Sequence, residues 1–283
     1  MHKKLPRPVA PFVTVASRTS LAAAFARVVR SGGGAGGDGV DIAQYSLDTR
    51  GTLGALEREL KSGGYRPGPY RRYAIAKPGG GKRKLSVPCI RDRIVQSAVA
   101  DALDRALDKK MSKASFAYRR GLSVEHAGAL VMFHRLRGFT WAVDGDIEKF
   151  FDNVEHKRLI RLLKGLGVCE KTNRLIAQWL GHFARRGRGL PQGSPLSPVL
   201  ANLFLMPFDK AMESKRVKLV RYADDFLLLT RSKARAKEAR MAAEKKLAGL
   251  GLKLNRRKSK LVRLQDGLTF LGLNISGDGI SRA

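Results

Sequence analysis

Residues 218–232 have the sequence KLVRYADDFLLLTRS, which carries the strongest structural signal in the chain. Two apolar runs flank Tyr222-Ala223-Asp224-Asp225, a pattern that predicts two strands joined by a tight turn. Adjacent carboxylates at the end of buried strands raise each other's pKa and cost stability unless a cation compensates. Asp224 and Asp225 therefore suggest a divalent-ion site. The alternative is an ordinary polar hairpin tip, because aspartate is common in turns.

A second acidic segment strengthens the ion-site hypothesis. FTWAVDGDIEKFF (139–151) predicts an apolar strand that runs into a turn and carries Asp146 at its end. A third carboxylate on a separate strand is what two-metal phosphoryl transfer requires, because two ions about 3.5–4 Å apart contact both the attacking and the leaving oxygens. Asp144 and Asp152 compete for this role. Spacing does not choose between Asp144 and Asp146, since alternate residues of a strand share a face.

The rest of the chain predicts a mixture of helices and strands. We expect helices near 21–29, 53–62, 92–110, 123–137, 156–166, 171–183, 197–213 and 233–250, and strands within 70–90, 252–262 and 268–276. The segment 70–90 should form a hairpin with a Gly-rich tip, and SGGGAGGDG (31–39) is a flexible linker by composition. Because the strands and helices alternate without βαβ regularity, the fold class is α+β.

Charge indicates the kind of partner. Fifty-five Lys and Arg residues oppose 24 Asp and Glu residues, which gives a net charge of +31. Such a surplus repels itself unless a polyanion neutralises it, so nucleic acid is the expected partner. Ribosomal and membrane-surface proteins are alternatives, but neither class needs the carboxylate pattern.

Composition also suggests where the protein acts. The sequence has no run of about 18 apolar residues, so we expect no transmembrane helix and no membrane partner. The N-terminal residues have no continuous apolar stretch, and we find no secretory signal there. Cys89 and Cys169 lack metal-ligand spacing. These features predict a reduced, cytoplasmic setting.

Several motifs in this order resemble those of bacterial reverse transcriptases of the group II intron-like and CRISPR-associated lineage. The palm-like motifs are DIEKFFDNVEH (146–156), LPQGSPLSPVLANLFL (190–205) and RYADDFLLL (221–229). The finger-like motifs are DGV (38–40), YRPGPYRRYAIAKPGGGKRKLSVPCIRDRIVQ (65–96) and SFAYRRGLSVEHA (115–127), and FLG (270–272) completes the set. The resemblance covers residues 38–276.

The resemblance implies a right-hand polymerase arrangement of fingers and palm. The fingers are expected at 40–140 and 152–188, and the palm at 141–151 and 189–283. A basic extension (1–30) and the Gly-rich linker (31–39) precede them. The chain ends about ten residues after the last motif, so the helical thumb of the family is expected to be missing or truncated.

The resemblance also assigns a role to each candidate site residue. It selects Asp146 over Asp144 and places two Mg²⁺ ions, with Mn²⁺ as a substitute, at Asp146, Ile147, Asp224 and Asp225. Lys258 would protonate the leaving pyrophosphate. The nucleotide-binding residues would be Lys77, Arg83, Lys84, Phe151 and Gln192, and Phe270, Leu271 and Gly272 would form the primer grip.

Simpler explanations exist for several of these residues. The cations of the 70–90 hairpin can be a solvated basic surface, and Phe270-Leu271-Gly272 can be core packing. GGGK (79–82) lacks the spacing of a phosphate-binding P-loop and the Ser or Thr that follows its Lys. An NTPase is therefore not expected.

The activity implied by the resemblance is RNA-directed DNA polymerisation from a primer 3′-hydroxyl. Its partners would be an RNA template, a DNA or RNA primer and dNTPs, with a structured non-coding RNA, an intron RNA or a CRISPR integrase as further candidates. The biological settings that share this core are group II introns, CRISPR-associated systems and phage defence in bacteria. The alternatives are a catalytically weak RNA-binding scaffold, a retron-type enzyme and an RNA-templated RNA polymerase.

Overall fold

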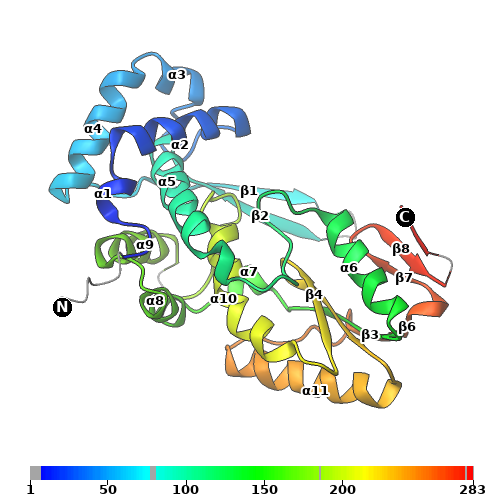
Figure 1. The fold of residues 1–283 in the computed structure, drawn as a ribbon. Helices are drawn as coiled ribbons and strands as arrows, with labels where there is room; N and C mark the ends of the chain where they lie inside the picture. Colours follow the sequence, from blue (N-terminus) through cyan, green and yellow to red (C-terminus); the bar gives the residue numbers. More distant parts are fainter. Residues whose placement is uncertain (1–7, 77–80, 185, 278, 283) are drawn as a thin grey trace, which may run out of the picture. The chain divides into compact units, whose positions relative to one another are not determined.

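The computed structural model describes residues 8–76, 81–184, 186–277 and 279–282 (Figure 1). The chain forms two compact units, each built from two separate stretches of sequence. Unit 1 comprises residues 1–108 and 155–200, and unit 2 comprises residues 109–154 and 201–283. Of the residues expected in the fingers, 109–140 and 152–154 lie in unit 2, and of those expected in the palm, 189–200 lie in unit 1.

Unit 1 is mainly helical and carries one hairpin. Its helices are α1 (Phe12–Val15), α2 (Arg18–Ser31), α3 (Ile42–Ser46), α4 (Thr49–Ser62), α5 (Ile90–Leu107), α8 (His156–Gly165) and α9 (Glu170–Phe183). A short 3-10 turn (Asp108–Lys110) follows α5. Local signals set the helix ends: the Asp48 side chain accepts from Gly51 N at the start of α4, and Gly63 ends that helix in the left-handed conformation.

The glycine-rich segment 31–39 is held in place, contrary to the expected flexible linker. The Arg93 guanidinium donates to the carbonyl oxygens of Gly32 (3.1 Å) and Gly34 (2.8 Å). A Cβ atom at Gly36 would lie 2.4 Å from Cys89 Cα, so this glycine permits close backbone packing. The composition was misinterpreted because glycine serves both loose linkers and tight backbone contacts.

Strands β1 (Arg71–Ala76) and β2 (Lys82–Val87) form the expected hairpin. All residues of β1 are exposed, so this hairpin is not a core element. Of the predicted tip, only Gly81 lies among the described residues.

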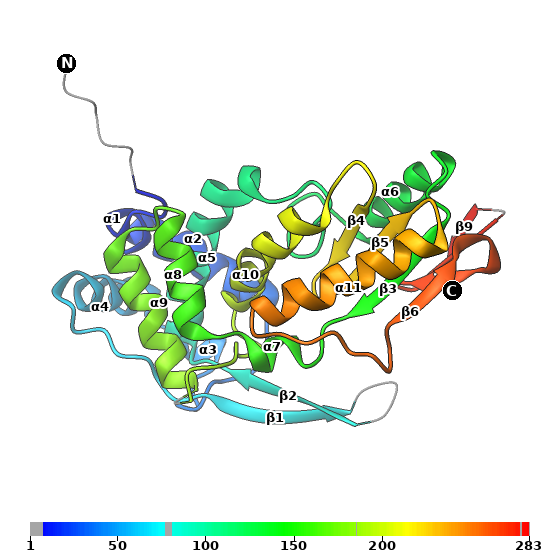
Figure 2. The same cartoon turned by 90° about the horizontal axis from the view of Figure 1, so that it is seen from below.

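Unit 2 is built on a four-stranded antiparallel sheet of order β4-β5-β3-β6. Its strands are β3 (Trp141–Asp146), β4 (Lys218–Tyr222), β5 (Asp225–Thr230) and β6 (Lys260–Arg263). Its helices are α6 (Val124–Leu136), α7 (Phe150–Asn153), α11 (Lys233–Gly249) and all but the first four residues of α10 (Ser197–Met212). Helix α11 runs along β3, β5 and β6 (Figure 2).

A second sheet of unit 2 has the order β7-β8-β9, with β7 at Leu268–Phe270, β8 at Leu273–Ser276 and β9 at Gly279–Arg282. The segment 268–276, expected as one strand, is thus a hairpin, because Leu271 and Gly272 have φ angles of 57° and 75° and reverse the chain. A 3-10 turn (Leu264–Asp266) precedes it. Phe270 and Ile275 join α6 and β5 in one apolar cluster.

Residues 252–259 also differ from the strand expected at 252–262, since only 260–263 pair as a strand. The mixture of helices and antiparallel sheets confirms the predicted α+β class. In the part of the chain that the structure describes, no helix is long and apolar enough to span a membrane.

Candidate active site

The turn between β4 and β5 carries two of the predicted carboxylates. Ala223 adopts the left-handed conformation with φ 59°, and Asp224 follows it. Asp225 is the first residue of β5 and lies directly opposite Asp146, the last residue of β3. The antiparallel register therefore places three aspartates at one end of the sheet. Asp144 lies two residues back along β3, opposite Leu227.

Asp225 is the most strongly perturbed of the clustered carboxylates. Burial raises the pKa of Asp225 to about 7, with further contributions from the negative charges of Asp224, Asp146 and Asp144. The Lys258 ammonium opposes this shift. Burial also raises the pKa of Asp144, and Lys260 opposes that shift.

Gly145 separates the two aspartates of β3 and is required by packing. A Cβ atom there would lie 2.3 Å from the ring of Phe226, which faces Gly145 across the β3–β5 pair. Phe226 in turn packs on Phe208 of α10, with ring centroids 5.0 Å apart. The core thus fixes the backbone between Asp144 and Asp146.

The segment 252–259 folds around Asp146, which explains why it is not a strand. Asn255 donates twice to this residue: its amide Nδ2 reaches Asp146 Oδ2 and its backbone N reaches Asp146 O, both at 2.8 Å. Asp146 N donates to Ser259 Oγ (3.3 Å). Lys258 Nζ lies 3.6 Å from Asp146 Oδ1, and its side chain is 70% exposed. Sequence analysis identified Lys258 but missed Asn255 and Ser259, although both lie within the same LNRRKSKL motif.

The three carboxylates suit a divalent ion in chemistry and placement. Carboxylate oxygens are the ligands that Mg²⁺ prefers. Burial, and after it the neighbouring negative charges, raises the pKa of Asp225, and a bound cation would favour its ionised form. Among the described residues, however, no three His, Cys, Asp or Glu side chains converge on a single point where an ion could be held. Instead, the Asp146 carboxylate contacts Asn255 and Lys258. Ile147, also predicted at the metal, is buried and bridges to Leu254.

Phe150 and Phe151 differ in burial, as expected for adjacent residues at the end of a strand. Phe150 is 1% exposed and packs near Phe204 of α10. Phe151 is partly exposed and meets Phe150 edge to face, with ring centroids 5.5 Å apart. Phe151 is therefore the one whose ring is accessible to a ligand.

The two described cations of the predicted triphosphate site, Arg83 and Lys84, lie on different faces of the β1–β2 hairpin. Arg83 pairs with Ile75 and Lys84 with Ala74, so the two cations project from opposite faces of the hairpin. Both are exposed. The register therefore places Lys84, predicted to assist Arg83 in binding the triphosphate, on the other face of the hairpin. Lys77, the third predicted cation, lies outside the described residues.

Gln192 is tied to the same hairpin through its backbone. Ser86 N of β2 donates to Gln192 O (2.6 Å), and a Cβ atom at Gly193 would lie 2.9 Å from Ser86 O. Gly193, with φ 119°, therefore permits this close contact. The Gln192 side chain is partly exposed.

The predicted primer grip divides into a buried and an exposed part. Phe270 is a core residue, 3% exposed, and its side chain packs in the apolar cluster with α6 and β5. Leu271 is partly buried and Gly272 is exposed. The accessible part of the motif is the turn at Leu271 and Gly272.

Comparison with known proteins identifies the family. Residues 75–275 match the family model described as reverse transcriptase (RNA-dependent DNA polymerase). Protein YkfC of Escherichia coli (strain K12) is 30% identical over 87% of this chain and 78% of its own length. The group II intron-encoded protein LtrA of Lactococcus lactis is 33% identical over 58% of this chain and 28% of its own length.

A solved structure agrees in fold. A chain of a partial Cas6-RT-Cas1–Cas2 complex is 30% identical over 87% of this chain, with a TM-score of 0.50. This chain covers 42% of that one, so it spans well under two thirds of both the LtrA protein and the solved chain. The family match extends over more than half of the present sequence and includes the segments that carry Asp146, Asp224 and Asp225. The chain therefore belongs to the reverse transcriptase family and carries an RNA-dependent DNA polymerase domain of α+β fold.

Proposed function

We propose that this protein adds deoxynucleotides to a primer 3′-hydroxyl on an RNA template, with two Mg²⁺ ions held by Asp146, Asp224 and Asp225. The placement of Asp225 opposite Asp146, with Asp224 beside it, is the observation that carries this proposal. A protein that only binds RNA would gain nothing from carboxylates clustered where phosphates approach, since like charges repel. The divalent-metal dependence of the family is the general basis for naming an ion.

The residues around the carboxylates have separate tasks in this reaction. When bound, the two ions would increase the nucleophilicity of the primer 3′-oxygen and neutralise charge on the leaving pyrophosphate. Asn255 fixes the carboxylate of Asp146 through its side-chain amide. Lys258, an exposed ammonium beside Asp146, is suited to donating a proton to the pyrophosphate. Mn²⁺ would serve as a substitute ion.

The remaining assignments rest on the resemblance and on exposure. Arg83 is an exposed guanidinium whose planar fork suits phosphate oxygens, and it would bind the triphosphate. Gln192 would contact the incoming nucleotide or its template partner. Phe151 would lie beneath the nucleotide sugar and exclude a 2′-hydroxyl. The turn at Leu271 and Gly272 would contact the primer.

The relatives support a biological setting. We propose a bacterial, cytoplasmic enzyme of the intron-like and CRISPR-associated lineage, with a structured RNA or a CRISPR integrase as partner. The similarity to LtrA and to the Cas6-RT-Cas1–Cas2 chain supports both settings. Defence against phage is a third setting for the same core.

Single-nucleotide incorporation tests the proposal. Asp224→Asn and Asp146→Ala should abolish incorporation in Mg²⁺ and leave primer–template affinity nearly unchanged, because neither reduces the surplus of positive charge. Asp266→Asn is the matched control, since Asp266 is an exposed acid of the same unit. Incorporation by Asp224→Asn at the wild-type rate would show that the carboxylates are not the metal site. Activity absent from the wild type itself would favour the RNA-binding scaffold.

A further inference from the structure

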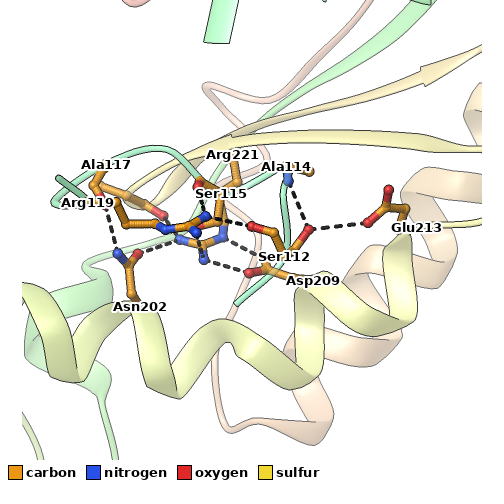
Figure 3. A network of polar contacts seen from close by, with 10 residues as sticks. Ser112, Ala114, Ser115, Ala117, Arg119, Asn202, Asp209, Glu213 and Arg221 are labelled. Atoms are coloured by element: carbon orange, nitrogen blue, oxygen red, sulfur yellow. Dashed lines mark hydrogen bonds and ion pairs between the residues drawn. The ribbon is translucent and has the colours of Figure 1, made fainter. Parts of the chain in front are cut away.

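Arg221 is a buried charge within the sheet that carries the site. It lies on β4 and is 1% exposed. Figure 3 shows its guanidinium surrounded by polar groups from several segments of unit 2. Its five hydrogen bonds go to Asp209 Oδ1 and Oδ2 (2.6 Å each), Asn202 Oδ1 (3.1 Å), Ser115 Oγ (2.7 Å) and Ala223 O (2.8 Å).

This arrangement can be made only by arginine. A guanidinium has five N–H groups in a fixed planar fork, and here each of the five has a partner. A lysine ammonium has three donors on a single nitrogen, so it cannot reproduce these five bonds, which arise from three nitrogens. The backbone of Arg221 is also fixed, since its N donates to Ala114 O (2.7 Å) and its O accepts from Phe116 N (2.9 Å).

Stability alone does not account for the network. Removing two charges from water costs about as much as their attraction returns, so a buried ion pair is often no more stable than apolar residues of similar volume. Both Arg221 and Asp209 are 1% exposed, and they sit beside a core rich in Leu and Phe that could accept apolar replacements. A need to hold a neighbouring backbone group in one orientation, rather than a gain in stability, explains the buried ion pair.

The backbone group that Arg221 orients is the carbonyl of Ala223. This residue has φ 59°, a left-handed conformation that is unfavourable for a non-glycine residue. The bond from Arg221 to the Ala223 carbonyl fixes the peptide plane that joins Ala223 to Asp224. That plane sets how Asp224 leaves the turn and where Asp225 begins β5. Arg221 thus holds the backbone from which both carboxylates project.

We propose that Arg221, anchored by Asp209, is a positioning residue that orients Asp224 and Asp225 for metal binding. The proposal rests on the proposed metal role of these aspartates. Asn202 strengthens the anchor, because its Nδ2 donates to Ala117 O (2.7 Å) while its Oδ1 accepts from Arg221. Helix α10 and residues 115–117 are thereby tied to the turn.

Two variants separate positioning from folding. Arg221→Lys keeps a positive charge beside Asp209 but lacks the separate nitrogens that bond Asp209 and Ala223 at the same time. The double variant Arg221→Met/Asp209→Leu removes both charges and leaves apolar side chains. Arg119→Lys is the matched control, because it makes the same Arg-to-Lys change at a guanidinium whose bonds to the carbonyls of Ser112 and Ser115 lie in the same network.

Three measurements are made on each variant: melting temperature, Mn²⁺ affinity by electron paramagnetic resonance without nucleic acid, and incorporation rate against Mg²⁺ concentration. Arg221→Lys and the double variant should lose about 10-fold in Mn²⁺ affinity and need about 10-fold more Mg²⁺. The maximal rate should fall about 10- to 100-fold, because displaced catalytic groups react slowly. Primer–template affinity should stay unchanged, and Arg119→Lys should match wild type.

The outcomes are distinct. A double variant that melts near the wild-type temperature yet keeps these defects supports positioning. Wild-type metal affinity and rate in either variant would overturn it. Failure of both variants to fold would show that Arg221 serves stability, which also overturns it. If Asp224→Asn remains active, the proposed function fails instead, and this result is independent of the Arg221 variants.

Discussion

Asp146 depends on a neighbour that is not itself acidic. The amide of Asn255 holds one carboxylate oxygen while its backbone N holds the Asp146 carbonyl. Asn255→Ala removes only the side-chain bond, so the carboxylate can rotate away from its productive orientation. We expect the maximal rate of incorporation to fall about 10-fold, with primer–template affinity unchanged. Rates measured at saturating nucleotide and Mg²⁺ check this.

Arg256→Ala is the control for Asn255→Ala. Arg256 lies next in the chain, is exposed and pairs with Glu244 instead of Asp146. If both variants lose the same fraction of activity, the segment acts through its overall conformation and the specific role of Asn255 is refuted.

Choice of sugar should depend on Phe151. Its ring is partly exposed, and trimming it to Ala leaves every carboxylate in place. Discrimination between dATP and ATP should then fall by about 10- to 100-fold, or roughly 1.4–2.7 kcal/mol. Phe150→Ala is the contrasting variant: Phe150 is buried, so the fold should lose about 3–5 kcal/mol while selectivity in the folded enzyme stays. Unchanged selectivity in Phe151→Ala, or a wild type that prefers ribonucleotides, would favour RNA polymerisation.

The aspartates were identified from the sequence, but the residues that hold them in position were not. Asp224 and Asp225 are conspicuous because paired charges between apolar runs need an explanation. Asn255 is an uncharged residue in a basic segment, and its role appears only when 252–259 folds back on β3. Arg221 lies in a short apolar strand, and its charge was an available signal that sequence reasoning did not use. Partners from residues 115, 202 and 209 cannot be read from local sequence.

At the scale of elements, the β1–β2 hairpin separates two cations by face. Arg83→Ala should raise the apparent nucleotide KM and lower the rate together, because a phosphate contact strengthens as charge moves onto the pyrophosphate. Lys84→Ala removes the same charge from the opposite face and should change both parameters less. Steady-state kinetics at subsaturating dNTP measure the difference. Equal effects would mean that the hairpin contributes only general positive charge, and an unaffected Arg83→Ala would remove Arg83 from the site.

Elements were predicted well where one face or one cap dominates, and poorly where long-range contacts decide. The strands around YADD and helix α11 match their expected positions closely, because apolar runs and the Ser232 cap define them. The segment 268–276 is a hairpin because Leu271 adopts a positive φ, a conformation that cannot be predicted from a leucine in the sequence. The glycine-rich segment 31–39 was mistaken for a linker because its partners, Arg93 and Cys89, are distant in sequence, with Arg93 61 residues from Gly32.

At the scale of the whole molecule, charge is the dominant property. A net charge of +31 cannot be neutralised internally, because 55 Lys and Arg residues face only 24 Asp and Glu residues. Most of the ion pairs in the described residues also join side chains that are partly or fully exposed. Such pairs contribute little to stability. The surplus therefore serves association, and it acts on any nucleic-acid backbone regardless of sequence.

Affinity for an RNA/DNA hybrid should consequently fall steeply as salt rises. Each neutralised phosphate releases counterions, so contact with about six phosphates gives a slope near −5 in a plot of log affinity against log salt. Two hybrids of unrelated sequence should give the same slope, since a polymerase reads duplex shape and backbone rather than bases. Asp224→Asn is the control, because it changes the proposed metal site without removing a cation, and its slope should equal that of wild type. Fluorescence anisotropy between 50 and 300 mM KCl, about the range in which such slopes are resolved, measures all three. A flat response would show that the basic surface binds something other than nucleic acid, whereas a strong dependence on hybrid sequence would show that base contacts, not phosphates, supply the affinity.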